Sequence, residues 1–583
     1  MREELVDVAL RQKPADIVIK DGNLVNVFTG EIYQADVAIK GDRIASVGKA
    51  DGIISNSTAV VSGKGKYLVP GFIDGHVHIE SSMMEVTQFA RAVLPIGTTG
   101  IITDWHEVGV VAGLKGIKTM LEIGSKTPLK IFWVVPSHGP VLEGLETVGV
   151  LIGPKDIEKA LKWKEAIGLS ETLAAGVETH SKPLLDSIRF TIELRKTVEG
   201  HAAGFSGDEL QSWVAAGAES DHEATTTEEA LERARFGIGL MMREGSVSKD
   251  LTACIKVLTQ HGINAQNCMV VTDDAHPTDL VKYGHMNFKV KRAIEEGVDP
   301  VTAIQMASLN TARHFRIDRD VGGIAPGKLA DILVVNNLRE LNIEKVFANG
   351  RLVGENGKFA LPMSKPKYPA ALRNTVHLKK RVAPKDLMAT ANVGTDRVDV
   401  KVLVVRDDTL LKDVERVALR VEKGAIQPDV SKDALALAVV ERHRATGNIG
   451  KVFVSGFGLK SGAIASTVAH DNHNIIVVGT NFEDMAIAAN KLAESKGGLT
   501  AVKDGKVLEL IKLPICGLLS DLPVAEVGEK LEKLHKEVRK LGGKLRSPFM
   551  TMSFIPCAIP KLLVSDKGYV DPIELKLVDL LDK

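Results

Sequence analysis

Eight apolar segments between residues 67 and 276 constrain the fold of this chain more than any other feature, because each one ends in polar, often ionisable, residues. The segments are YLVPGFIDGHVH, TTGIITDWHE, IFWVVPSH, AIGLSET, KTVEGH, AGAESDHE, IGLMMREGS and CMVVTDDAH. Helical patterns lie between most of them, for example at 154–164, 226–235 and 248–260. Eight strand–helix units of this total length predict a (β/α)8 TIM-type barrel over residues 71–320.

Short strands are predicted on both sides of the barrel. Residues 16–70 alternate apolar and polar side chains, and glycines punctuate them at turn spacing. Similar sequence returns at 321–360. We therefore predict a split β-sandwich domain, made of residues 1–70 and 321–370, with the barrel inserted into it.

The rest of the chain predicts a further α/β domain over residues 371–583. Residues 361–400 are rich in Pro and Lys and indicate a linker or surface crossover. The segment GFGLKSGAIAS fits neither G-x-G-x-x-G nor the P-loop spacing, so it predicts a tight turn into a helix. His470, Asp471 and His473 are interpreted as a hydrogen-bonded turn at a domain contact, with a second metal site as the alternative.

Charge and cysteine content exclude several classes of function. The 74 basic and 74 acidic side chains cancel, which gives no electrostatic reason for a nucleic-acid or membrane partner. Four well-separated cysteines form no C-x-x-C pair, so a disulfide scaffold and a cysteine-ligated zinc ribbon are not expected. The start of the chain has no apolar signal core, and no window is apolar enough to span a bilayer. These features indicate a cytoplasmic enzyme.

The polar ends of the predicted strands carry a set of metal-binding residue types. His76 and His78 are two residues apart, so both side chains point to the same side of the first strand. Strands four, five, six and eight end in Glu171, His201, His222 and Asp273 with Asp274. Imidazole and carboxylate at this density suit a divalent transition metal. The set exceeds what one tetrahedral ion needs, and a carboxylate on a middle strand can bridge two ions.

Each of these residues taken alone has an ordinary structural explanation, since the chain has 16 histidines. Their coincidence at one predicted barrel mouth favours the metal site. Competing motifs are incomplete: the H-x-E at His78 lacks the P-C-x-x-C of zinc deaminases, and HEVGV at 106–110 lacks a second histidine. GFSGD at 204–208 is not a G-x-S-x-G nucleophile elbow.

Several quoted motifs resemble the adenine deaminase family of the amidohydrolase superfamily. They are PGFIDGHVHIESSMM, DWHE, GLSE, SDHEATT, MMREGS, VTDDAHP and AIQMASLNTARHF in the first part, and GAIASTVAHDNHNIIVVGTN and PFMTMSFIPCAIP near the end. The resemblance implies hydrolytic deamination of adenine, a small purine base, to hypoxanthine and ammonia by a metal-bridged hydroxide. It also implies two divalent ions, Mn²⁺ or Fe²⁺ with Zn²⁺ as an alternative, and a homo-oligomer.

The resemblance assigns roles to individual residues. His76 and His78 would bind one ion with Asp273 beside it, His201 and His222 would bind the other, and Glu171 would bridge. Asp273 would also shuttle a proton, with Asp274 as its alternative at the strand end. Candidate substrate contacts are Glu80, Ser81, His106 and Asp274; Glu80 is also a candidate proton relay or partner of a ligand histidine.

Three departures from the family pattern lie at the predicted mouth. They are Trp105 in DWHE, the stretch TLAAGV after Glu171, and His138 in VVPSHGP. They leave an N6-substituted adenine or another aminopurine open as the substrate. Cyclic-amide hydrolases of this fold normally have a lysine where Glu171 stands, which argues against that activity. A non-catalytic scaffold is disfavoured because the ligand set is complete.

Overall fold

The barrel is the centre of the fold in the computed structural model, which describes residues 2–140, 142–391, 394–407, 412–557, 562–572 and 574–581. Neighbouring strands pair in parallel and in chain order. The strands are β6 (Phe72–Asp74), β8 (Thr98–Thr103), β9 (Lys130–Pro136), β10 (Ala166–Leu173), β11 (Thr197–His201), β12 (Ser220–Asp221), β13 (Gly239–Arg243) and β14 (Cys268–Val271). All eight predicted segments therefore form barrel strands.

A short second pairing brings the first and last strands together. The two-residue strands β7 (Val77–His78) and β15 (Asp273–Asp274) run parallel and place Asp274 opposite His78. The buried Asp74 carboxylate accepts hydrogen bonds from the Thr272 hydroxyl at 2.6 Å and from the Thr272 amide at 3.2 Å. The histidine pair and the aspartate pair are thus held side by side by the closure of the barrel.

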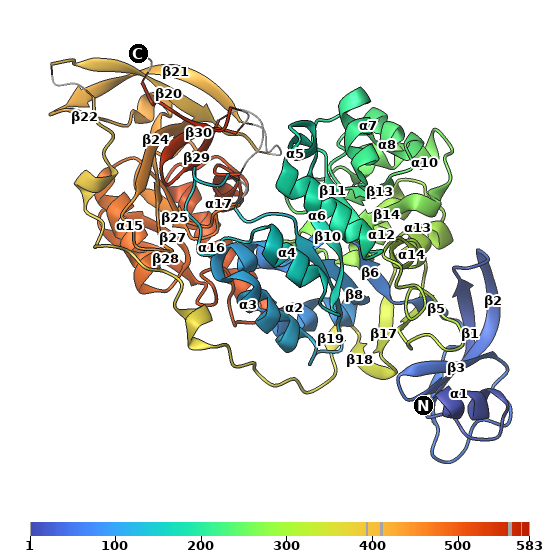
Figure 1. Cartoon of the computed structure of the whole chain (residues 1–583). Helices are drawn as coiled ribbons and strands as arrows, with labels where there is room; N and C mark the ends of the chain where they lie inside the picture. The colour runs from blue at the N-terminus through green and yellow to red at the C-terminus, as the bar shows by residue number, and fades with distance from the viewer. Residues whose placement is uncertain are drawn as a thin grey trace.

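Helices surround the barrel, as Figure 1 shows in the cyan and green part of the chain. The predicted helical patterns appear as α4 (Pro154–Leu161), α8 (Thr227–Arg235) and the pair α9 (Leu251–Cys254) and α10 (Lys256–Thr259). The other helices of this region are α2 (Val86–Val93), α3 (His106–Gly124), α5 (Ala174–Glu178), α6 (Lys182–Glu193), α7 (Gly207–Ala216), α11 (Pro277–Lys282), α12 (Met286–Glu295), α13 (Pro300–Met306) and α14 (Leu309–His314). Their apolar faces and the strands form one large buried cluster.

One β-sheet joins two distant parts of the chain, as predicted. Its order is β19-β18-β17-β16-β5-β1-β2-β3, with β4 on β1. After the short helix α1 (Arg2–Ala9), the strands are β1 (Ile17–Asn26), β2 (Glu31–Lys40), β3 (Arg43–Gly48), β4 (Ala59–Ser62) and β5 (Tyr67–Pro70), then β16 (Ile332–Val335), β17 (Ile343–Ala348), β18 (Arg351–Glu355) and β19 (Lys358–Phe359). Antiparallel pairing of β5 with β16 makes the join. The residue limits of the domains stay a prediction.

The segment predicted as the first barrel strand divides at Gly71. The part before it, β5, belongs to the joining sheet, and the part after it, β6, belongs to the barrel. A Cβ at Gly71 would overlap the Thr99 side chain, and the Gly71 amide donates to the Asp331 carbonyl at 2.9 Å. The close approach of strand β8 therefore requires glycine where the chain passes between sheets.

The last part of the chain forms a nine-stranded mixed sheet in the order β22-β21-β20-β24-β23-β26-β25-β27-β28. Its strands are β20 (Arg397–Val404), β21 (Asp413–Glu422), β22 (Ala425–Ile426), β23 (Leu435–Val440), β24 (Ile449–Ser455), β25 (Ala463–Ser466), β26 (Ile475–Gly479), β27 (Gly498–Lys503) and β28 (Lys506–Lys512). Helices α15 (Phe482–Glu494), α16 (Val524–Lys540) and α17 (Pro548–Ser553) and a small sheet of β29 (Leu563–Ser565), β30 (Gly568–Asp571) and β31 (Lys576–Val578) complete it.

The expected turn into a helix at GFGLKSGAIAS is wrong. The turn leads into β25, which is hydrogen-bonded on both sides, to β26 and β27. Each of its residues, Ala463–Ser466, is buried. Small residues fit this central position because neighbouring strands and α15 pack closely on it. The linker expected at 361–400 contains two short 3-10 turns, Ala370–Arg373 and Pro384–Leu387, before β20 begins at Arg397.

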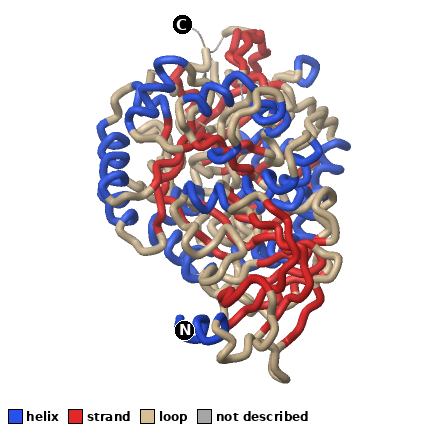
Figure 2. The backbone as a smooth tube through the Cα atoms, turned by 90° about the vertical axis from the view of Figure 1, so that its right-hand side faces the viewer, coloured by secondary structure: helices blue, strands red, loops and turns tan. Residues whose placement is uncertain are grey.

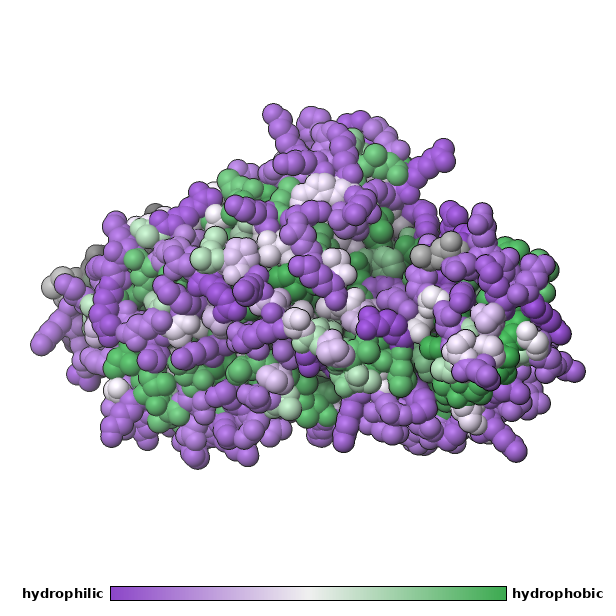
Figure 3. Space-filling view, turned by 90° about the horizontal axis from the view of Figure 1, so that it is seen from below, coloured by the Kyte–Doolittle hydropathy of each residue, from purple (hydrophilic) through white to green (hydrophobic). Residues whose placement is uncertain are grey.

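The chain forms three bodies that lie in a row (Figure 1). They are the joining sheet, the barrel in the middle, and the last body, which consists of the nine-stranded sheet with its helices and the small sheet. Figure 2 shows the joining sheet gathered at the end of the molecule near the N-terminus. Helix α16 packs against α11 of the barrel, so the last body contacts the barrel directly. Hydrophilic and hydrophobic residues intermingle on the face shown in Figure 3. Among the described helices, none combines the length and apolar character needed to cross a membrane.

Replacing Gly200 by Ala should destabilise the barrel. A Cβ at Gly200 would overlap the Trp213 ring and lie 2.7 Å from the Ser220 carbonyl oxygen. Overpacking of this kind costs about 1–3 kcal/mol, so we expect a lower thermal unfolding midpoint. The control is Gly153→Ala, because a Cβ there meets nothing within 4 Å. Equal midpoints for both variants would contradict this packing argument.

Candidate metal centre

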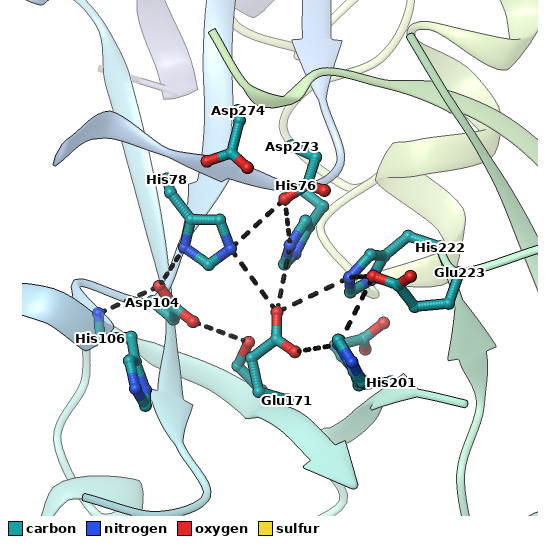
Figure 4. A network of polar contacts seen from close by, with 12 residues as sticks. His76, His78, Asp104, His106, Glu171, His201, His222, Glu223, Asp273 and Asp274 are labelled. Atoms are coloured by element: carbon teal, nitrogen blue, oxygen red, sulfur yellow. Dashed lines mark hydrogen bonds and ion pairs between the residues drawn. The ribbon is translucent and has the colours of Figure 1, made fainter. Parts of the chain in front are cut away.

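Side chains from the ends of barrel strands one, five, six and eight converge on Glu171, which lies at the end of strand four, as Figure 4 shows. Glu171 Oε1 lies 3.2 Å from His76 Nε2, 3.6 Å from His78 Nε2 and 3.7 Å from His222 Nε2. Glu171 Oε2 lies 3.0 Å from His201 Nδ1. One carboxylate therefore faces four imidazoles, three through Oε1 and one through Oε2.

Asp273 completes the group on the side of the histidine pair. Its Oδ1 lies 3.5 Å from His76 Nε2 and 3.4 Å from His78 Nε2. Asp274 turns away, and its carboxylate accepts a hydrogen bond from the Ser81 hydroxyl. The six residues predicted as metal ligands are thus brought together, and Asp273 rather than Asp274 faces the imidazoles.

The backbone at the two central carboxylates is in the left-handed region, with φ of 53° at Glu171 and 59° at Asp273. The pairing of β10 with β11 shifts register between Leu169 and Thr172, around Glu171. Left-handed non-glycine residues and β-bulges recur where a side chain is re-aimed at a functional site. Here both features lie at the strand ends that point Glu171 and Asp273 into the mouth.

The charges in this cluster fit bound cations. Burial alone would raise the pKa of Glu171, but His222, His201 and His76 lower it well below its usual value. Burial alone would lower the pKa of His76, but Asp273 and Glu171 raise it to about 10. The carboxylates of this cluster therefore favour positive charge at this position, which divalent ions can supply.

The donor atoms also fit metal ions. His76 Nε2 and His201 Nδ1 are buried and have no hydrogen-bond partner among the described residues, although carboxylate oxygens are near both. Three groups of potential ligands lie here, with the chosen atoms of each group within 4.8 Å of one another. They are His76, His78 and Asp273; His76, Glu171 and His222; and His201, His222 and Glu223. The first and the third of these groups share no residue.

Sequence reasoning missed two residues of this cluster, Glu223 and Arg243. Glu223 Oε1 lies 3.3 Å from His222 Nε2 and 3.5 Å from His201 Nδ1. Arg243 NH1 lies 2.6 Å from Glu223 Oε1 and 3.0 Å from Asp273 Oδ2. Both residues are in the quoted segments SDHE and MMREGS, and Arg243 ends the seventh strand. The rule that selected the other strand ends therefore applied to Arg243 as well.

A second layer of carboxylates lies behind His78. Asp104 Oδ1 is 3.2 Å from His78 Nδ1, and Glu107 Oε1 is 3.7 Å from the same nitrogen. Asp104 and Glu107 belong to the DWHE motif, which follows β8 and includes the first two residues of α3; its Trp105 is buried with φ of 55°. The motif thus places two acidic groups on the nitrogen of His78 that faces away from Glu171.

The predicted substrate contacts lie beside the cluster. Glu80 is buried, and its Oε1 accepts a hydrogen bond from the Val108 amide at 3.2 Å. Burial raises the pKa of Glu80 well above its usual value, with Glu107 and Asp104 adding to the effect. His106 begins α3 and its ring lies 5.0 Å, centroid to centroid, from the ring of His138. The two departures therefore lie near each other, because His106, which contacts His138, is the sequence neighbour of Trp105.

Other residues take structural positions. Asp221 accepts from the Ala202 amide at 2.9 Å and pairs with the buried Arg233. His314 is 2.8 Å from Glu199 Oε2. The remaining histidines interpreted as structural or surface residues are His180, His261, His377 and His535. None of these five histidines belongs to a group of potential metal ligands within the described ranges.

Comparisons with known proteins identify families for the barrel and for the last part of the chain. Residues 67–353 match the Amidohydrolase family, and residues 409–575 match the Adenine deaminase C-terminal domain. An adenine deaminase of Moorella thermoacetica is 45% identical over 99% of this chain and 98% of its own length. Adenine deaminase 3 of Rhizobium meliloti is 44% identical over the same shares of both chains. A solved beta-aspartyl dipeptidase of Fervidobacterium islandicum is 15% identical over 60% of this chain and 99% of its own, with a TM-score of 0.46.

Proposed function

The chain belongs to the adenine deaminase family of amidohydrolases, and we propose that the residues converging on Glu171 form its binuclear catalytic centre. Membership makes the chain a hydrolase that converts adenine and water to hypoxanthine and ammonia, and it implies a divalent metal centre. The observation that carries the proposal for the site is the position of Glu171, within 3.0–3.7 Å of four imidazole nitrogens.

We assign the ligands in two groups. His76, His78 and Asp273 would hold one ion, His201 and His222 would hold the other, and Glu171 would be shared between them. The mixture of imidazole and carboxylate suits Mn²⁺ or Fe²⁺, and Zn²⁺ is the alternative. When bound, such ions lower the pKa of a coordinated water from 15.7 to about 7, which supplies a nucleophile at neutral pH.

The chain's own residues then handle protons and orientation. Asp273 lies beside the imidazole ligands, where its carboxylate could take a proton from the attacking water and pass it to the ring or the departing amine. His76 and Arg243, which both contact Asp273, lower the pKa of its carboxyl well below the usual value despite its burial. Glu80, held neutral by burial and by Glu107, can donate a hydrogen bond to a ring nitrogen of the purine.

A parallel substrate assay tests the activity. The purified protein is supplied with Mn²⁺ or Fe²⁺ and given adenine, 6-methylaminopurine, adenosine and dihydrouracil. We expect ammonia from adenine. Ammonia from 6-aminopurines other than adenine would assign the alternative substrate class. No ammonia from any aminopurine would refute the deaminase activity. Dihydrouracil tests the cyclic-amide alternative in the same experiment.

Metal removal should lower the thermal stability of the protein. An ion that binds only the folded chain stabilises it by about 2.7 kcal/mol when its concentration is 100 times its dissociation constant. Chelation followed by dialysis should therefore lower the unfolding midpoint, and Mn²⁺ should restore it. Mg²⁺ is the control, because it prefers oxygen ligands to imidazole. Identical midpoints with and without Mn²⁺ would count against the metal centre.

A cytoplasmic location and a homo-oligomeric state are also part of the proposal. Light scattering on the purified chain tests the oligomer, with a dimer or larger assembly as the expected result.

A further inference from the structure

A turn of the last body, residues 469–474, lies against the barrel next to the metal centre. Asn472 Nδ2 donates to Glu146 Oε2 at 3.2 Å, and Asn474 Nδ2 donates to the Thr147 carbonyl at 2.9 Å. The His470 amide donates to the Ser553 carbonyl at 2.7 Å. The turn predicted at a domain contact is therefore fixed from both sides, by the loop after β9 and by α17.

Two histidines of this turn reach the carboxylate layer behind His78. His470 Nδ1 lies 3.4 Å from Glu107 Oε1. A ring nitrogen of His470, a ring nitrogen of His473 and a Glu107 oxygen all lie within 4.8 Å of one another. The three side chains are buried, with residue exposures of 5%, 0% and 2%. The same Glu107 oxygen is 3.7 Å from His78 Nδ1.

The hydrogen bonds of His473 decide between a third metal site and a hydrogen-bonded clamp. The Ala469 amide donates to His473 Nδ1 at 3.2 Å, so in the neutral ring the proton sits on Nε2. A protonated Nε2 is a donor and not a metal ligand. His473 Nε2 makes no hydrogen bond to the described residues, and the nearby Glu107 carboxylate is the acceptor that this cluster offers it.

We propose that His470 is a positioning residue of the metal centre, which acts by holding Glu107 against His78. The Asp104 and Glu107 carboxylates lie within ion-pair distance of Nδ1 of His78, while its Nε2 faces Glu171 and Asp273. Carboxylates behind a ligand histidine set its orientation and basicity, and their loss typically weakens metal binding about 10–100-fold. The last body of the chain thus completes the centre built by the barrel. This inference rests on the proposed role of His78 as a metal ligand.

Titration of metal-free protein with Mn²⁺ tests the inference. We expect His470→Ala to weaken one of the two ions about 10–100-fold and to leave the other unchanged. His470→Gln should recover most of the affinity because its amide keeps a donor for Glu107. The matched control is His377→Ala, a partly exposed histidine of the same part of the chain whose Nε2 contacts the Asn374 carbonyl. Equal affinities for His470→Ala and the control would overturn the inference.

A double-mutant cycle separates positioning from a packing role. The His470 ring also stacks on Phe554, with centroids 4.7 Å apart, so its removal could act through stability alone. If His470 acts through Glu107, adding His470→Ala to Glu107→Gln should cause no further loss of affinity. A second full loss would refute the inference, whatever the change in unfolding midpoint.

The variant His78→Asn distinguishes this inference from the proposed function. This variant should lose altogether the ion that His76, His78 and Asp273 are proposed to bind. If His78→Asn keeps both ions, the proposed ligand set is wrong. If it loses one ion while His470→Ala binds both as tightly as the original chain, only the positioning role is wrong.

Discussion

Glu171→Gln should lose bound metal and deaminase activity together. The substitution keeps the size of the side chain but replaces a charged oxygen with an amide nitrogen, which cannot bridge two cations. Loss of an outer partner of a ligand already costs about 10–100-fold, so we expect the loss of the bridge to exceed about 100-fold in kcat. Metal content per chain, measured by elemental analysis, should fall in the same preparation.

The control for this substitution is Glu178→Gln, an exposed position on α5 of the same barrel. It should retain the metal content and kcat of the original chain. Full metal content in Glu171→Gln would show that the bridge has been assigned to the wrong residue. A folded variant is expected, because removing the charge of Glu171 favours neutral forms of the imidazoles that face it, and neutral imidazoles do not repel one another.

The cluster could be predicted because one geometric rule places its members together. The carboxyl ends of parallel barrel strands meet at one mouth, so His76, Glu171, His201 and His222 needed only a correct assignment of strands. The rule says which side chains meet but not what each one contacts. Arg243 also ends a barrel strand, but a positively charged side chain is not a metal ligand, so the residue types alone did not indicate it. Its role emerges only from the distances to Glu223 and Asp273.

The contact of His470 with Glu107 could not be predicted in the same way. The two residues lie on different bodies of the chain, and no periodic pattern relates a turn after β25 to the first turn of α3. The mistaken helix at β25 has a related cause. A short run of small apolar residues fits a buried strand as well as a helix, and only the neighbours β26 and β27 decide between them.

The division at Gly71 shows a further limit of pattern reading. The residue at which an apolar run leaves one sheet and enters another cannot be predicted from hydrophobicity, because both sheets bury the run equally well. The steric requirement at Gly71 depends on Thr99, which belongs to the next strand. Packing between β8 and this segment, rather than the local sequence, therefore determines the division at Gly71.

Asp273→Asn should reduce kcat about 10²–10⁴-fold, the usual contribution of a positioned acid or base, whereas Asp274→Asn should reduce it far less. Asp273 Oδ1 lies 3.4 Å from His78 Nε2, while Asp274 is bonded to Ser81. An asparagine at 273 keeps the shape of the side chain but cannot accept and return a proton. Arg243 still pairs with Glu223 at 2.6 Å and Asp250 at 2.9 Å, so its charge stays compensated and the variant should fold.

Steady-state kinetics and unfolding midpoints of the two variants, each loaded with Mn²⁺, make the comparison. A larger loss of kcat in Asp274→Asn than in Asp273→Asn would reverse the assignment. Equal losses would indicate that the pairing of β7 with β15, rather than either carboxylate, sets the rate, since both aspartates lie in that two-residue ladder opposite Val77 and His78.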